Sequence, residues 1–152
     1  MTVIVLGSES ALFHRLMSPS LSHPSASVSS RPLALLVEDH DGYRRIVRQA
    51  LECFLPEWTV CEADGVRSAV EMLGQTGADV LVCDLMLPDG TAADLVDQLS
   101  ALKCDQTQVI VFSNHSAEAL EPLRNHQQVR GCLMKERGLK ELALMIEQTT
   151  PR

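Results

Sequence analysis

The chain has 152 residues, of which 45% are hydrophobic and 22% charged, which is the composition of one ordinary folded domain. Its formal net charge of −7 argues against a nucleic-acid-binding surface, because such a surface needs a basic patch to replace counterions. No apolar run approaches the roughly 18 residues that span a bilayer, and no basic stretch precedes the first apolar run, so the sequence predicts neither a membrane anchor nor a signal peptide.

The first 31 residues form a predicted N-terminal extension. Residues 3–16 indicate a short strand, a Gly-Ser turn and a short helix. Residues 17–31 read MSPSLSHPSASVSSR, and this excess of serine and proline predicts a flexible linker. The pattern becomes regular at Pro32, so we place a folded domain at residues 32–150.

Apolar runs and helical repeats alternate five times along this domain. Short runs that are apolar throughout predict strands at residues 33–37, 58–61, 80–83, 109–112 and 131–134. Apolar residues at helical spacing predict helices at residues 43–54, 66–73, 92–99, from about 116, and 139–146. The second helix is predicted to end at Gly74 and Gly77. The inward face of the first is predicted to carry Ile46, Val47, Ala50, Leu51 and Phe54.

Strands that are apolar on both faces belong to a parallel sheet covered by helices on each side. Connections between parallel strands of one sheet are right-handed, which leaves few topologies. The sequence therefore predicts an α/β fold of the flavodoxin-like, doubly wound type. It has helices on both faces of a five-stranded parallel sheet in the order 2-1-3-4-5.

Polar side chains follow the predicted strands at their carboxyl ends. Glu38 and Asp39 follow the first strand, Asp84 the third, Ser113 the fourth and Lys135 the fifth. Ligands bind at this edge of an open α/β sheet, and the first and third strands are neighbours, so we expect the three acids to meet. Any one of these acids alone is more often a helix cap or a solvated side chain, and only the matching set predicts a site.

Three clustered carboxylates repel one another and need a balancing charge. Mg²⁺ suits this place because it takes carboxylate oxygens and keeps some of its waters. With the Lys135 ammonium and the Ser113 hydroxyl, the ion makes a cradle for a phosphoryl group facing the Asp84 carboxylate. A carboxylate that attacks phosphorus forms an acyl phosphate.

Four segments carry a resemblance to a known family, and they read LALLVEDHDGYRR, DVLVCDLMLPDG, VIVFSNHS and GCLMKERG. Together they resemble the response-regulator receiver domain of two-component signalling, over residues 32 to about 149. The resemblance implies that Asp84 is phosphorylated. It also implies that Glu38 and Asp39 hold Mg²⁺ directly or through water, and that Met86 lends the ion its backbone carbonyl.

The resemblance also implies roles for residues on the later strands. Ser113 matches the switch hydroxyl that moves toward the phosphoryl group, and Lys135 matches the lysine that pairs with it. Pro88 and Gly90 match the turn that shapes the loop after the acceptor. A protein of this kind is a phosphoprotein in a phosphorelay, and we do not class it as an enzyme.

The partners follow from the same resemblance. The phosphodonor would be a sensor histidine kinase or a histidine phosphotransfer protein. Because the sequence ends a few residues after the last predicted helix, we expect a stand-alone receiver that binds a downstream protein partner or forms a homodimer. Leu144 and Met145 lie off the inward stripe of that helix and suit such a surface. We expect no direct nucleic-acid or membrane partner.

Several positions depart from the usual pattern of the family. Cys132 stands where receivers usually carry a Tyr or Phe that rotates inward as the hydroxyl moves, and a thiol cannot sweep out that volume. Asn114 replaces a small residue after the hydroxyl. Glu136 replaces a frequent cis-proline after the lysine, so we expect a trans peptide there. Met86 and His115 occupy the two positions that tune the lifetime of the acyl phosphate.

Other functions fit parts of the pattern. The main alternative is an interaction module that keeps the receiver fold and signals without phosphate, which Cys132 and Asn114 favour. A phosphatase with an aspartate nucleophile would need a second Asp at the position of Met86. A nucleotide-binding domain would need a glycine-rich turn in place of the acidic VEDHDG.

The five cysteines form no C-x-x-C pair and have no zinc-ligand spacing with the five histidines. Most of them lie in apolar runs, so the sequence predicts buried, reduced thiols and a reducing, cytoplasmic location. They are Cys53, Cys61, Cys83, Cys104 and Cys132.

Overall fold

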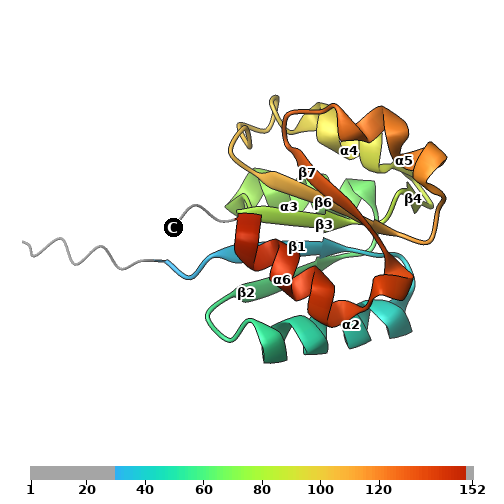
Figure 1. Ribbon diagram of the computed structural model, residues 1–152. Coiled ribbons are helices and arrows are strands. Elements are labelled where there is room, and N and C mark those ends of the chain that lie inside the picture. The colour runs from blue at the N-terminus through green and yellow to red at the C-terminus, as the bar shows by residue number, and fades with distance from the viewer. Residues whose placement is uncertain (1–29, 150–152) are drawn as a thin grey trace, which may run out of the picture. The chain divides into compact units, whose positions relative to one another are not determined.

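The computed structural model describes residues 30–149. The strand, turn and helix predicted for the N-terminal extension, and all but the last two residues of the predicted linker, fall on residues 1–29 and so lie outside the described residues. Strands and helices alternate along the described chain (Figure 1). The main strands are β1 (Leu33–Val37), β2 (Thr59–Ala63), β3 (Val80–Cys83), β6 (Gln108–Ser113) and β7 (Val129–Met134). The helices are α2 (Asp41–Phe54), α3 (Val66–Thr76), α4 (Ala92–Gln98), α5 (Ala117–Arg124), the 3-10 turn η1 (Lys135–Arg137) and α6 (Leu139–Thr149).

The five main strands form one parallel sheet in the order β2-β1-β3-β6-β7. A short hairpin, β4 (Met86–Leu87) with β5 (Gly90–Thr91), interrupts the numbering but not the sheet. Without it the order is the predicted 2-1-3-4-5, so the predicted doubly wound fold is confirmed. The central pair β1 and β3 places Val37 opposite Cys83, which aligns the ends of the two strands.

The core has two halves, one on each face of the sheet. Leu35 and Val37 of β1 face the half built with α3, α4 and α5, whereas Ala34 and Leu36 face the half built with α2 and α6. Successive side chains of a strand point to opposite faces, so every central strand contributes to both halves. Figure 1 shows α2 and α6 together on one side of the sheet. Each fully buried aliphatic side chain contributes about 1.5–3 kcal/mol, which is why the strands read as continuous apolar runs.

Two predictions on the inward face of α2 are wrong. Ile46 is 56% exposed and Phe54 is 47% exposed, although both were predicted to face the core. Val47 and Leu51 are the only fully buried residues of this helix, because α2 packs on the sheet mainly at the edge strand β2 and only a narrow stripe of it is covered.

The end of α3 also differs from the prediction. Gly74 lies inside the helix, and Gly77 alone ends it. Gly77 has a positive φ of 67°, which a glycine adopts without steric cost, and it donates its N–H to the Leu73 carbonyl. A glycine within a helix costs only about 1 kcal/mol, so Gly74 is tolerated there.

The described residues contain no helix that is both long and apolar enough to span a bilayer. All five cysteines are free thiols. Cys83 and Cys104 are buried, but Cys53 is exposed because it lies outside the narrow inward stripe of α2, so the prediction of burial is wrong for that thiol.

The two-sided core makes a direct prediction. Leu81 is fully buried in β3, so Leu81→Ala should lower the free energy of unfolding by about 3 kcal/mol through lost burial and a residual cavity. Ile46→Ala is the matched control and should lose less than about 0.5 kcal/mol, because Ile46 faces solvent. Urea unfolding followed by circular dichroism measures both. Equal losses for the two variants would contradict the outward placement of Ile46.

Candidate functional site

Three carboxylates meet at the carboxyl end of the central strands. Glu38 and Asp39 follow β1, and Asp84 follows β3. One oxygen from each carboxylate lies within 4.8 Å of the others. The N–H of Asp84 donates to the Val37 carbonyl at 3.2 Å, and the N–H of Glu38 donates to the Ala63 carbonyl at 3.1 Å. These bonds continue the sheet pairing past the strand ends, so the carboxylates sit on rigid backbone.

Lys135 and Ser113 bring donors to this cluster from the last two strands. The Lys135 ammonium lies 2.7 Å from Glu38 Oε2 and 2.8 Å from Asp84 Oδ2. The Ser113 hydroxyl donates to Asp84 Oδ1 at 2.8 Å, and the hydroxyl oxygen accepts from the N–H of His115 at 3.3 Å. Each oxygen of Asp84 therefore has its own partner, and all five residues predicted at the strand ends lie together.

Glu38, Asp84 and Lys135 have mostly buried side chains, and burial strengthens the interactions between their charges. Glu38 is only 4% exposed. Burial works to lower the pKa of Lys135, but hydrogen bonds to Asp84 and Glu38 outweigh it and leave that pKa above its ordinary value. Burial raises the pKa of Cys83, and the charges of Asp84 and Glu38 raise it further, so this thiol stays protonated. Removing one partner of a buried ion pair generally costs about 3–5 kcal/mol.

The donor set fits a divalent cation. Three carboxylates and one ammonium leave two negative charges in a small space. A hard cation such as Mg²⁺ accepts carboxylate oxygens and retains waters, which matches a cluster with both a buried acid, Glu38, and an exposed one, Asp39. Met86, the predicted source of a backbone carbonyl, lies two residues after Asp84 at the start of β4.

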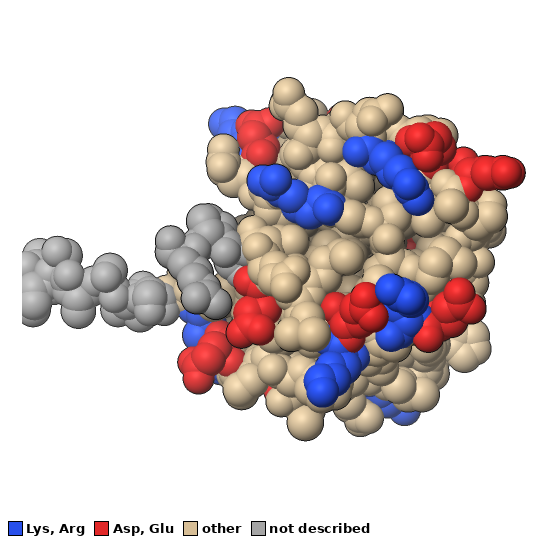
Figure 2. All heavy atoms as spheres, viewed as in Figure 1, with Lys and Arg blue, Asp and Glu red and all other residues tan. Residues whose placement is uncertain are grey.

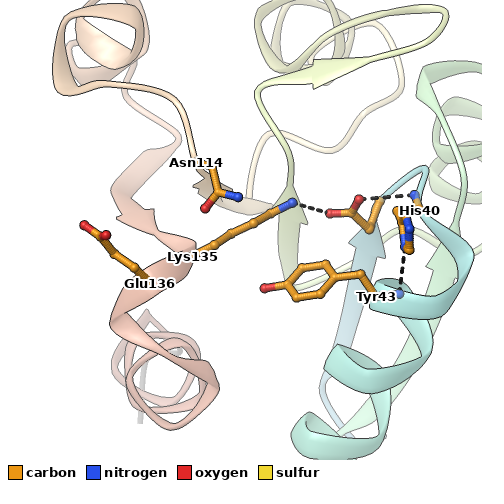
Figure 3. A pocket seen from close by; sticks show the side chains of 6 residues that line it. His40, Tyr43, Asn114, Lys135 and Glu136 are labelled. Atoms are coloured by element: carbon orange, nitrogen blue, oxygen red, sulfur yellow. Dashed lines mark hydrogen bonds and ion pairs between the residues drawn. The ribbon is translucent and has the colours of Figure 1, made fainter.

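A cavity of about 560 Å³ opens beside the lysine, and its residues are drawn in Figure 3. His40 and Tyr43 line it from the start of α2, together with Asn114 and Glu136. His40 caps α2, because its Nδ1 accepts a hydrogen bond from the N–H of Tyr43 at 3.1 Å. The Lys135 ammonium lies over the Tyr43 ring, 4.7 Å from its centroid.

The contributions of His40 and Tyr43 were not predicted from the sequence. The sequence holds only a weak indication of them. The acids are followed at once by a helix, so the first turn of that helix must lie at the same edge of the sheet as the acids. Spacing along the chain does not say which way a side chain of that turn points.

The loop after Asp84 is tied to the start of α3. Asp89 Oδ1 accepts from the N–H of Val66 at 2.8 Å, and Oδ2 accepts from the N–H of Arg67 at 2.9 Å. These bonds satisfy two of the N–H groups that a helix leaves unpaired at its start. Gly65 permits the approach, since a Cβ there would lie 2.6 Å from Asp89 Oδ1. The predicted turn at Pro88 and Gly90 thus has an anchor that the sequence analysis missed.

The comparison with protein families decides the identity of this arrangement. The sequence profile described as the response regulator receiver domain matches residues 34–147. The chain belongs to this family. None of the curated proteins compared with the chain matches it.

Solved structures of receivers share the fold. The receiver domain of the putative response regulator NarL from Mycobacterium tuberculosis is 22% identical, with a TM-score of 0.70 over 81% of this chain and 99% of its own. A LuxR-family two-component response regulator from Aurantimonas sp. SI85-9A1 is 24% identical, with a TM-score of 0.70 over 78% of this chain and 84% of its own. A LuxR-family DNA-binding response regulator from Staphylococcus aureus is 17% identical, with a TM-score of 0.67 over 78% of this chain and 98% of its own. Because all three structures are less than 25% identical to this chain, the comparison shows a shared fold alone.

Three positions depart from the usual pattern of the family, and two of them border the cavity beside Lys135. Cys132 is partly buried on β7 and borders a cavity of about 350 Å³ with Arg124. Burial raises the pKa of its thiol, although Arg124 opposes the effect. Asn114 and Glu136 both border the cavity beside Lys135. Residues 30–149 contain no cis peptide bond, which confirms the trans peptide expected at Glu136.

The anchor of the loop can be tested by its pH dependence. Hydrogen bonds from the backbone of Arg67 and Val66 lower the pKa of Asp89. A depressed pKa means that the stabilisation is complete above the unfolded-state value of about 3.9 and is lost as the pH falls through the lower folded-state value. Asp89→Ala should therefore lower the urea midpoint by the same amount at pH 7 and pH 5.

A matched control for this variant is Asp105→Ala, which removes an exposed carboxylate. It should leave the urea midpoint unchanged at both pH values. A deficit of Asp89→Ala that disappears between pH 7 and pH 5 would contradict a cap formed by a charged carboxylate with a lowered pKa.

Proposed function

We propose that the protein is a phospho-accepting receiver in which Asp84 takes up a phosphoryl group with the help of Mg²⁺. This proposal rests on the surroundings of Asp84. Its carboxylate lies beside those of Glu38 and Asp39, and each of its two oxygens accepts a hydrogen bond, one from Ser113 and the other from Lys135. A purely structural carboxylate needs neither the neighbouring acids nor two separate donors.

The reaction transfers a phosphoryl group from an atom of the donor to an oxygen of Asp84. An oxygen of the Asp84 carboxylate attacks phosphorus and forms a new O–P bond. The bond from phosphorus to the donor breaks, and its electron pair leaves with the donor, which takes up a proton. For a sensor histidine kinase or a histidine phosphotransfer protein, this leaving atom is a nitrogen of the donor imidazole.

The residues of the site have separate tasks in this transfer. Glu38 and Asp39, with Asp84 and the Met86 carbonyl, would hold the Mg²⁺, which supplies positive charge to the phosphoryl oxygens. Ser113 donates a hydrogen bond and Lys135 a positive charge to those oxygens once the group has arrived. None of these groups turns over a substrate, so the protein acts as a phosphorelay component and not as an enzyme.

The output is proposed to be protein binding through the last two helices. Ser113 ends β6 and Lys135 follows β7, and these strands lead into α5 and α6. Leu144 of α6 is 48% exposed and offers apolar surface to a partner or to a second copy. In Figure 2, uncharged residues fill a band on this face between charged groups of both signs. This pattern favours a protein partner over nucleic acid or a membrane.

The setting of this function is also a proposal. The receiver would act in the cytoplasm, where free thiols are stable. The Staphylococcus aureus structure is described as a DNA-binding regulator, and that description belongs to that protein. The net charge of −7 supports the view that this chain acts on proteins.

The acceptor can be tested by intact mass. After incubation with Mg²⁺ and acetyl phosphate, the wild-type chain should gain the mass of one phosphoryl group. Asp84→Asn should gain none, because the amide is not a nucleophile. Removal of Mg²⁺ with a chelator should also abolish the adduct. Asp39→Asn should raise the Mg²⁺ concentration needed for half-maximal labelling by roughly tenfold, since it removes about 1.4 kcal/mol or more of ion binding.

The matched control is Asp41→Asn, because Asp41 is an exposed acid two residues beyond the cluster. It should label like the wild type at the same Mg²⁺ concentration. A wild-type chain that is folded by circular dichroism but gains no adduct from any small phosphodonor would shift the assignment to the alternative. That alternative is the phosphate-independent interaction module, which Cys132 and Asn114 favour.

The coupling to the output face makes a separate prediction. Ser113→Ala should still form the adduct but lose most of the phosphorylation-dependent chemical-shift changes in α5 and α6, because the hydroxyl that follows the phosphoryl group is gone. Two-dimensional NMR with and without beryllofluoride measures these changes. Ser113→Thr keeps the hydroxyl and should retain them. Full changes in the alanine variant would rule out Ser113 as the link.

A further inference from the structure

Lys135 has three partners in the site, and one of them is not an acid. Its ammonium contacts Glu38 at 2.7 Å and Asp84 at 2.8 Å, and it lies over the ring of Tyr43 at 4.7 Å from the centroid. A cation at this distance over an aromatic face is attracted by the negative charge of the ring surface. The Lys135 side chain is only 12% exposed, so the contact is partly shielded from water, which strengthens it.

In Figure 3 the side chain of Lys135 runs between Asn114 on one side and Tyr43 on the other. Its ammonium ends 2.7 Å from Glu38 Oε2. The backbone of Tyr43 is fixed because its N–H donates to the His40 cap at the first turn of α2, and its side chain packs against the half of the core built with α2 and α6. The ring therefore belongs to a rigid element, whereas the lysine is a long, flexible chain.

The two acidic partners of Lys135 are the groups that the proposed function changes. A metal ion bound by Glu38 competes with the ammonium for that carboxylate. Phosphorylation of Asp84 converts the other carboxylate into an acyl phosphate. The contact with the Tyr43 ring requires neither carboxylate, so neither event removes one of its two partners.

We propose that Tyr43 is a positioning residue, whose ring holds the Lys135 ammonium in the site while its acidic partners are exchanged. This inference rests on the proposed function. The ammonium is attracted by the face of the aromatic ring, and the phenol hydroxyl is not required. Burial raises the pKa of Tyr43, and although Lys135 opposes this, the ring stays neutral at pH 7 and keeps its attraction for a cation.

The test compares two substitutions of Tyr43 in the full chain. Tyr43→Leu removes the aromatic face and keeps a side chain of substantial volume. It should slow phosphoryl uptake from saturating acetyl phosphate and Mg²⁺ by roughly two- to tenfold, which is the size of a cation–π contact. Tyr43→Phe keeps the face and should restore the rate to within about twofold of the wild type. Equal slowing by Phe and Leu would overturn the role of the ring face.

A double-mutant cycle separates positioning from a structural effect. In a Lys135→Met background, Tyr43→Leu should have no further effect, because the cation it holds is gone. An equal slowing in both backgrounds would overturn the inference. If Lys135→Met leaves too little phosphoryl uptake to measure, the cycle is built from the urea unfolding constants of the wild type, the two single variants and the double variant. A coupling of roughly two- to tenfold is expected there, and its absence would overturn the inference.

The unfolding cycle also separates this inference from the function on which it rests. A wild-type chain that gains no phosphoryl group, with coupling between Tyr43 and Lys135 intact, overturns the proposed function and supports the ring–lysine contact. A wild-type chain that is labelled, with no effect of Tyr43→Leu, overturns the positioning role and supports the proposed function.

Discussion

The repulsion among the acids at the carboxyl edge of the sheet is the constraint around which the rest of this receiver is arranged. Two carboxylates at this separation in a partly buried place repel by several kcal/mol, even with substantial screening. Lys135 offsets part of that energy by lying within 2.8 Å of both Glu38 and Asp84. The ammonium comes from the far edge of the sheet, so the charge balance joins the ends of β1, β3 and β7. A divalent cation is the natural source of the remaining positive charge.

Rigid elements hold this edge in place. β1, β3 and β6 are buried on both faces by the two halves of the core, so the residues after them have little freedom. Two loops that border the site are tied down by caps. Asp89 fixes the loop after Asp84 to α3, and His40 fixes the turn after Glu38 to α2. The flexible part of the site is the lysine chain, and the Tyr43 ring lies against it.

Sequence patterns reached the strands and the residues after them, but not the surface of every helix. The runs 33–37 and 80–83 coincide with β1 and β3, because a strand buried on both faces has no polar residues to blur its limits. Ile46 and Phe54 were assigned to the core and are exposed, because helical spacing does not reveal how wide a stripe the sheet will cover. The hairpin of β4 and β5 was missed because two-residue strands have no periodicity.

The sequence by itself determined the fold class, the strand order and the group of side chains at one edge of the sheet. It could do so because burial dictates the apolar runs, and because parallel strands all place their carboxyl ends at that edge. Only the tertiary structure decided which atoms meet. That Asp89 caps a helix 22 residues earlier, and that Lys135 lies over Tyr43, depends on loop paths and side-chain directions. Local spacing does not encode these contacts, because residues distant in the chain supply both partners.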